Sequence, residues 1–177
     1  HDHFLTLAVT YEADAERHVQ MGRAYTGNPN RPSGATSFAV HCTQLAKLAN
    51  ESATILRELA AHHERLAAGA PSTVPKNGTR FEEGASAPAP TDTQLRELAT
   101  SARTPADHRS LEEYYVDLAA KYTSQAEKHV AMAQAYRGTR IAQAAVHCDR
   151  LIEASRKAAK QALAAAAEHR QQAGTVR

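Results

Sequence analysis

Two stretches of the chain match each other: Tyr11–Tyr25 reads YEADAERHVQMGRAY, and Tyr122–Tyr136 reads YTSQAEKHVAMAQAY. Eight of their fifteen aligned positions are identical. Farther along each half, the tetrapeptide AVHC occurs at Ala39–Cys42 and again at Ala145–Cys148. The two halves carry the same residue types in the same order, which indicates that one unit has been duplicated.

Each copy of this unit has the pattern of two helices. In the first copy, aromatic residues and a histidine recur every seven residues, at Phe4, Tyr11, His18 and Tyr25. This spacing is typical of a helix that packs one face against other helices. The last part of the second copy, 142–173, is rich in alanine, which favours helix formation and a close approach of helices.

We therefore predict an all-α fold, a four-helix bundle built from two duplicated helical hairpins. Residues 1–68 are expected to form the first hairpin and 105–177 the second, within one bundle domain. Between them, 69–104 is predicted to be a long irregular linker rich in Pro, Gly and Ser. The expected helices span 4–26, 37–68, 105–137 and 140–173.

Residues at the expected helix ends agree with this division. Thr91 and Gln94 have the spacing of a capping box, so a short helix is expected at Thr91–Thr100 inside the linker. Pro105 suits the first turn of the helix that it begins. Four glycines are expected just past helix ends in the left-handed conformation: Gly27, Gly69, Gly138 and Gly174.

The composition excludes several classes of protein. The chain has 177 residues and a net charge of +2 with neutral histidines, which gives no electrostatic reason to expect nucleic acid as a partner. The longest apolar run, Ala162–Ala167, is far too short for insertion across a membrane. The sequence has no phosphate-binding loop, nucleophile elbow or strand pattern, so it favours a binding protein over an enzyme.

The functional hypothesis rests on the histidines, of which there are ten. His18 and Met21 are three residues apart and share one helix face. In an antiparallel hairpin Met21 and Cys42 lie at nearly the same height, so imidazole, thioether and thiol should meet near each closed end. The predicted metal ligands are His18, Met21, His41 and Cys42 in the first copy and His129, Met132, His147 and Cys148 in the second.

This set of ligands favours copper. Thioether and thiolate are soft ligands and imidazole is borderline, which suits Cu(I) or a site of the blue-copper type. Zinc is less favoured because it rarely binds methionine. Non-covalent haem, with His and Met as axial ligands, is also less favoured because it gives the cysteines no role.

Three more histidines are weaker candidates for metal ligands: His3, His63 and His169. His63 and His169 each lie 21 residues beyond the cysteine of their own copy. Each can approach only the other copy's cluster, and only if the hairpins pack with opposite orientation. His3 would chelate Cu(II) with the terminal amine if His1 is the natural amino terminus. His62 is expected to be solvated and His108 to lie at the surface.

The sequence thus predicts an exported copper-binding bundle, periplasmic or secreted, that handles or sequesters copper or transfers electrons through it. Its partner would be a redox or copper-delivery protein. Export is inferred from the absence of an initial Met and from the soft ligands. Besides haem, two alternatives remain: a structural or interaction bundle locked by a Cys42–Cys148 disulfide, and a two-copper centre bridged by both thiolates.

Overall fold

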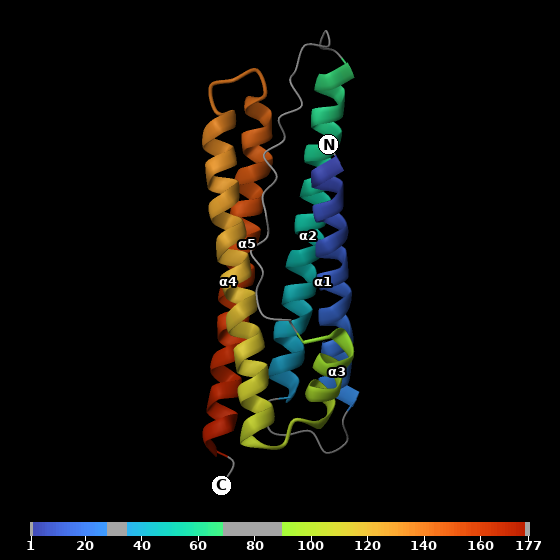
Figure 1. Ribbon diagram of the computed structural model, residues 1–177, viewed down its shortest axis with the longest axis vertical. Helices are drawn as coiled ribbons and strands as arrows, with labels where there is room; N and C mark the ends of the chain where they lie inside the picture. The colour runs from blue at the N-terminus through green and yellow to red at the C-terminus, as the bar shows by residue number, and fades with distance from the viewer. Residues whose placement is uncertain (1, 28–34, 69–89, 176–177) are drawn as a thin grey trace.

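The computed structural model describes residues 2–27, 35–68 and 90–175, and nearly all of them are helical (Figure 1). The helices are α1 (Asp2–Gly27), α2 (Ala35–Ala68), α3 (Asp92–Ser101), α4 (Pro105–Tyr136) and α5 (Ala142–Thr175). These ranges contain no strand, which confirms the predicted all-α class. Most of the predicted linker at 69–104 lies outside the described residues, and its described part contains α3.

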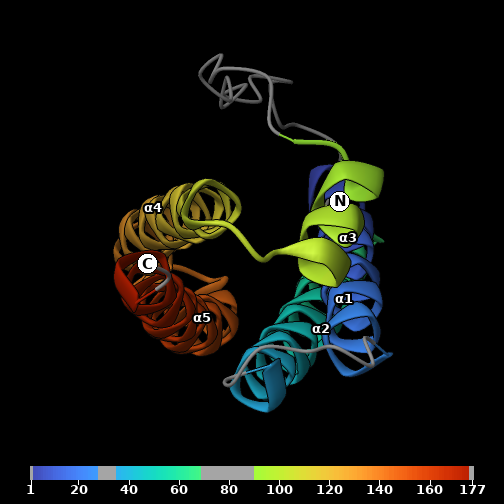
Figure 2. The ribbon, with the colours of Figure 1, turned by 90° about the horizontal axis from the view of Figure 1, so that it is seen from below.

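The four long helices form two antiparallel pairs. Helix α1 packs along α2, and α4 packs along α5. Figures 1 and 2 show one pair on each side of the molecule. The pairs meet where α2 packs against α5, while α3 lies against α1 and touches α4 (Figure 2).

The two pairs point in opposite directions along the long axis (Figure 1). At the lower end of Figure 1 the last turns of α5 lie beside the start of α2, where His41 Nε2 donates to Glu168 Oε1 at 3.0 Å. At the upper end the last turns of α2 lie beside the start of α5, where the rings of His62 and His147 are 6.2 Å apart. This is the orientation in which His63 and His169 are predicted to approach the other copy's cluster.

Side-chain size sets the spacing between the helices. The buried face of α5 is mainly alanine, so α2 approaches it closely. Helices α1 and α4 instead reach each other through long side chains. The Tyr11 hydroxyl donates to Gln125, and Lys121 Nζ lies 3.3 Å from Asp14 Oδ2. The interior between α1 and α4 is therefore the polar part of the core.

Helix ends are fixed by local hydrogen bonds. Thr91 caps α3 in a capping box with Gln94, as predicted, and Thr104 forms a second one with Asp107 ahead of α4. Pro105 occupies the first turn of α4, as predicted. Three of the glycines expected to be left-handed lie among the described residues, and Gly138 alone of these three has a positive φ, at +78°. The expectation is wrong for Gly27 and Gly174, which continue α1 and α5; Gly69 lies outside the described residues.

Candidate functional site

Six of the eleven candidate ligands gather, with other aromatic and polar residues, at the two ends of the molecule. The lower end cluster lies where α1 and α5 end and consists of Tyr25, His41, Cys42, His108, Tyr115 and His169. The upper end cluster lies where α2 and α4 end and consists of His62, His63, Tyr136, His147 and Cys148. Each cluster combines residues of both copies, because the pairs are oppositely oriented.

His169 forms the centre of the lower end cluster. Its Nε2 is 3.1 Å from the Tyr25 hydroxyl, and its Nδ1 is 3.1 Å from Nδ1 of His108. Phe38 stacks on the ring at 4.0 Å and Tyr115 at 5.6 Å. Burial, followed by the nearby His108 and His41, lowers the pKa of His169 to about 3. The ring is therefore neutral at pH 7 and engaged through both nitrogens.

His41 and Cys42, the other two candidate ligands in the lower end cluster, also have hydrogen-bond partners. Cys42 Sγ lies 3.3 Å from the Tyr115 hydroxyl, and burial raises the pKa of the thiol to about 11. His41 faces α5, with Nδ1 at 3.1 Å from Gln161 Oε1 and Nε2 bonded to Glu168. The lower end is thus a hydrogen-bonded network with no unpaired ring nitrogen on His41 or His169.

His18 and Met21 lie on the buried face of α1, as their spacing predicts. His18 is 0% exposed, and neither ring nitrogen has a hydrogen-bond partner among the described residues. Its neighbours are Asp14, Arg17 and Lys121, and burial lowers its pKa to about 4. The predicted level of Met21 and Cys42 agrees with the geometry, because a Cβ on Gly22 would lie 3.4 Å from Cys42 Cβ.

The second copy repeats part of this pattern. His129 is 3% exposed, and its Nδ1 has no hydrogen-bond partner in the described part of the chain. Burial, followed by His3 and Lys128, lowers its pKa to about 4. Met132 is partly buried against the core. His3, a weaker candidate, therefore lies near His129 and also contacts the Phe4 ring at 5.6 Å.

The upper end cluster holds three imidazoles close together. The His62 ring lies 6.2 Å from both the His63 and the His147 ring, and Tyr136 lies 5.7 Å from His63. His62 Nε2, His63 Nε2 and His147 Nδ1 are all buried without a hydrogen-bond partner among the described residues. Three ring nitrogens without a hydrogen-bond partner in the described ranges are therefore shielded from solvent within one small region.

Burial acts on the protonation of two of these histidines and of the cysteine. Burial lowers the pKa of His63 and of His147. His62 and His147 lower the pKa of His63 further, whereas Glu58 opposes the downward shift of the pKa of His147. Burial raises the pKa of the Cys148 thiol to about 11. Glu58 Oε2 lies 3.5 Å from His147 Nδ1 but is bonded to Arg150 at 2.5 Å. His63 and His147 are therefore neutral at pH 7, and the Cys148 thiol keeps its proton.

Comparison of the two copies explains why the ends differ. Three exchanges between equivalent positions distinguish the lower end from the upper: Tyr115 for Phe4, Glu168 for His62, and Phe38 for Ala144. The lower end gains a hydroxyl for its thiol, a carboxylate for its imidazole and a ring that stacks on its central histidine. At the upper end Phe4 stacks on His63 at 5.3 Å but has no hydroxyl to offer the Cys148 thiol. The carboxylate beside His147 is that of Glu58, which is also bonded to Arg150.

Several sequence-based expectations need correction. Cys42 and Cys148 are free thiols in two separate clusters, so the structure contains neither the alternative Cys42–Cys148 disulfide nor a centre bridged by both thiolates. The reason is the opposite orientation of the pairs. Within the described ranges, no three His, Cys, Asp or Glu side chains are placed to hold a metal ion as they stand.

Sequence reasoning also missed two members of the clusters. His108 is 1% exposed instead of lying at the surface, because the last turns of α5 pass over it. His62 is half-buried, and its inner nitrogen is shielded instead of solvated. In the sequence, both histidines lie near an expected helix end. This position predicts membership of a cluster only when the relative orientation of the two helix pairs is known.

No family model, curated protein or solved structure matches this chain. Among the described residues, none of the helices combines the length and apolar character needed to cross a bilayer. Function is therefore inferred from the chemistry of the two clusters.

Proposed function

We propose that this protein is a copper-binding helical bundle whose upper end cluster holds the ion. The observation that carries the proposal is the group of three buried ring nitrogens, on His62, His63 and His147, without a hydrogen-bond partner in the described part of the chain. Buried polar atoms without partners are rare and costly, and a bound ion satisfies all three at once. Cys148 would supply a thiolate beside them.

The protonation states suit metal binding. Imidazole binds a metal only when neutral, and burial keeps His63 and His147 neutral at pH 7. Cys148 must lose its proton on binding, so each Cu(I) that forms a Cu–S bond releases one H⁺. Because burial raises the pKa of this thiol to about 11, binding should weaken as the pH falls.

The ring separations are compatible with ligation after small side-chain rotations. A metal–nitrogen distance near 2.0 Å places the centres of two bound imidazoles roughly 5–6.5 Å apart. The observed separation is 6.2 Å for both pairs that include His62. Rotation about the soft χ2 angle would turn the nitrogens toward a common point.

A thioether favours copper over zinc in this proposal. Met132 lies on α4 one helical turn before Tyr136, which belongs to the upper end cluster. Zinc rarely accepts a thioether, whereas copper accepts thioether, thiolate and imidazole together. Met132 is therefore assigned as the additional ligand, and His129 as a buried neighbour.

The proposal includes a four-helix bundle of two duplicated hairpins. Its support is that equivalent residues have equivalent surroundings. Tyr25 lies against His169 as Tyr136 lies against His63, and both cysteines are 0% exposed. The export of the protein to the periplasm or medium, and a copper-delivery protein as partner, remain predictions.

The test is competition for Cu(I) against a chromogenic chelator, using paired variants at equivalent positions. His147→Gln and Cys148→Ser should each weaken Cu(I) binding at least tenfold. Their counterparts His41→Gln and Cys42→Ser should leave it unchanged, since that end is already hydrogen-bonded. Equal effects at both ends, or no binding by the parent, would contradict the proposal. Circular dichroism melts control for folding.

A second pair of variants separates copper from zinc. Met132→Leu should weaken Cu(I) binding without affecting Zn²⁺, while Met21→Leu should affect neither. Leucine conserves volume, so both variants should remain folded. If Met132→Leu binds Cu(I) as the parent does, the thioether is core filler and the preference for copper is lost.

A further inference from the structure

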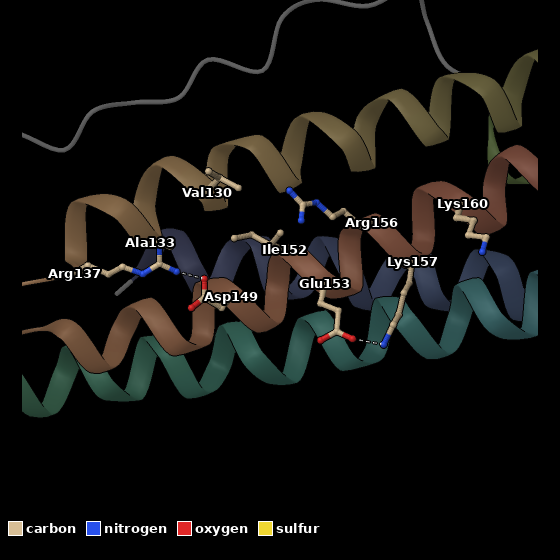
Figure 3. A pocket seen from close by; sticks show the side chains of 9 residues that line it. All are labelled: Val130, Ala133, Arg137, Asp149, Ile152, Glu153, Arg156, Lys157 and Lys160. Atoms are coloured by element: carbon tan, nitrogen blue, oxygen red, sulfur yellow. Dashed lines mark hydrogen bonds and ion pairs between the residues drawn. The ribbon is translucent and has the colours of Figure 1, made fainter.

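An open groove lies on the outer face of the α4–α5 pair, apart from both end clusters (Figure 3). Its volume is about 510 Å³, within the range of small-molecule sites. Val130, Ala133 and Ile152 form its apolar part. The remaining lining residues are all charged.

The charges of the groove are not balanced. Arg137 pairs with Asp149 at 2.7 Å, and Lys157 pairs with Glu153 at 2.6 Å. Two further lining cations, Arg156 and Lys160, have no ion-pair partner among the described residues. In Figure 3 the guanidinium of Arg156 extends from α5 toward α4. The groove therefore offers two unneutralised cations, one helical turn apart on α5. In Figure 3 the Arg156 guanidinium lies on the side of the apolar residues, and Lys160 lies at the other end of the groove.

This cationic pair is specific to the second copy. The residues equivalent to Arg156 and Lys160 in the first copy are Asn50 and Thr54, which are neutral. The neighbouring ion pair is kept in both copies with its signs exchanged, as Lys47–Glu51 and Glu153–Lys157. The two copies therefore share the paired charges but not the unpaired ones.

We propose that this groove binds a free medium-chain carboxylate, an anionic amphiphile. The planar guanidinium of Arg156 suits two-point recognition of the carboxylate, and Lys160 adds a second positive charge. The alkyl chain lies over Val130, Ala133 and Ile152, where it loses contact with water. This binding is independent of copper, since no residue of the upper end cluster lines the groove.

The experiment is a titration of the full chain with decanoate below its micelle concentration, followed by NMR chemical shifts. Arg156→Asn and Lys160→Thr together install the first copy's residues. They should weaken decanoate binding at least tenfold. The control removes two exposed charges outside the groove, through Lys128→Asn and Arg140→Thr, and should bind like the parent.

Additional ligands distinguish the alternatives. Acetate and decanol should bind at least tenfold more weakly than decanoate, because each carries only half of the recognised chemistry. The proposal is overturned if the double groove variant binds decanoate like the parent, or if acetate or decanol binds equally well. It is also overturned if the chain ignores decanoate and binds only vesicles of anionic phospholipid.

Discussion

Tyr25 and Tyr136 occupy equivalent positions in the two copies, but their hydroxyl groups have different surroundings. Tyr25 is 3% exposed and its hydroxyl lies 3.1 Å from His169 Nε2. Its counterpart Tyr136 is half-buried, and no hydrogen bond is described for its hydroxyl. The same residue type therefore anchors a histidine at the lower end and leaves His63 unpaired at the upper end.

This difference predicts unequal costs for the same substitution. Tyr25→Phe should lower the free energy of unfolding by about 1–2 kcal/mol, because His169 keeps a buried nitrogen without its partner. Tyr136→Phe should cost less than about 0.5 kcal/mol, since it removes no described hydrogen bond. Urea denaturation followed by circular dichroism measures both values. Equal costs would show that the hydroxyl of Tyr25 does not stabilise the lower end.

A second prediction at this scale concerns two glycines. Gly138 has φ +78°, and a side chain in the left-handed region costs roughly 1–2 kcal/mol, so Gly138→Ala should destabilise the protein by about 1 kcal/mol. Gly27 is helical and has open space around its Cβ position. Gly27→Ala should therefore stabilise the protein, by up to about 1 kcal/mol. Thermal melts measure both variants, and the prediction is wrong if Gly138→Ala and Gly27→Ala shift the melting temperature in the same direction.

At the scale of the helix, α5 shows how small residues set the distance between elements. Ala162 is 0% exposed, whereas the next residue, Leu163, is 54% exposed. A larger side chain at Ala162 has no space unless a neighbouring helix moves. The adjacent position projects into solvent and tolerates change.

Ala162→Leu should therefore destabilise the protein by about 1–3 kcal/mol, the usual cost of overpacking a core. Leu163→Ala should change stability by less than about 0.5 kcal/mol. Chemical denaturation of the two variants provides the comparison. A stable Ala162→Leu variant would mean that α5 is not closely packed at this level.

The helices were largely predictable because their signals are local. Each long helix begins and ends within two residues of its expected bounds, and the caps at Thr91 and Thr104 lie within four residues of the groups that they bind. The clusters were less predictable. Which side chain His41 meets depends on the direction of α5, and the bonds to Gln161 and Glu168 span more than a hundred residues. Heptad spacing shows which face is buried but not which helix covers it.

At the scale of the whole molecule, three deeply buried histidines make folding sensitive to acid. His18, His129 and His169 are at most 3% exposed, and burial lowers their pKa values to about 4, 4 and 3. None can take a proton in the folded state without a charge in the core. Within the described ranges, Asp14 favours protonation of His18, and Arg17 and Lys121 oppose it.

The sign of the pH dependence follows directly. The unfolded chain protonates these histidines near their ordinary pKa of 6.5, whereas the folded chain does so only near pH 4 or below. The unfolded state therefore binds more protons in this window, and stability falls as the pH drops below 6.5. At one pKa unit per 1.36 kcal/mol, His18 alone costs about 3 kcal/mol at pH 4.

We therefore expect a melting temperature that is level between about pH 7 and pH 8, below the ordinary pKa of the buried thiols, and that falls steeply between pH 6 and pH 4. Three such histidines together approach the total stability of an ordinary domain, so acid unfolding is expected before most carboxylates are protonated. His18→Leu should make the fall shallower, because one proton fewer is taken up on unfolding. The measurement is the melting temperature across this range for parent and variant. A parent whose melting temperature stays constant from pH 7 to pH 4.5 would contradict the burial of neutral histidines, and an unchanged slope in the variant would exclude His18 as one of them.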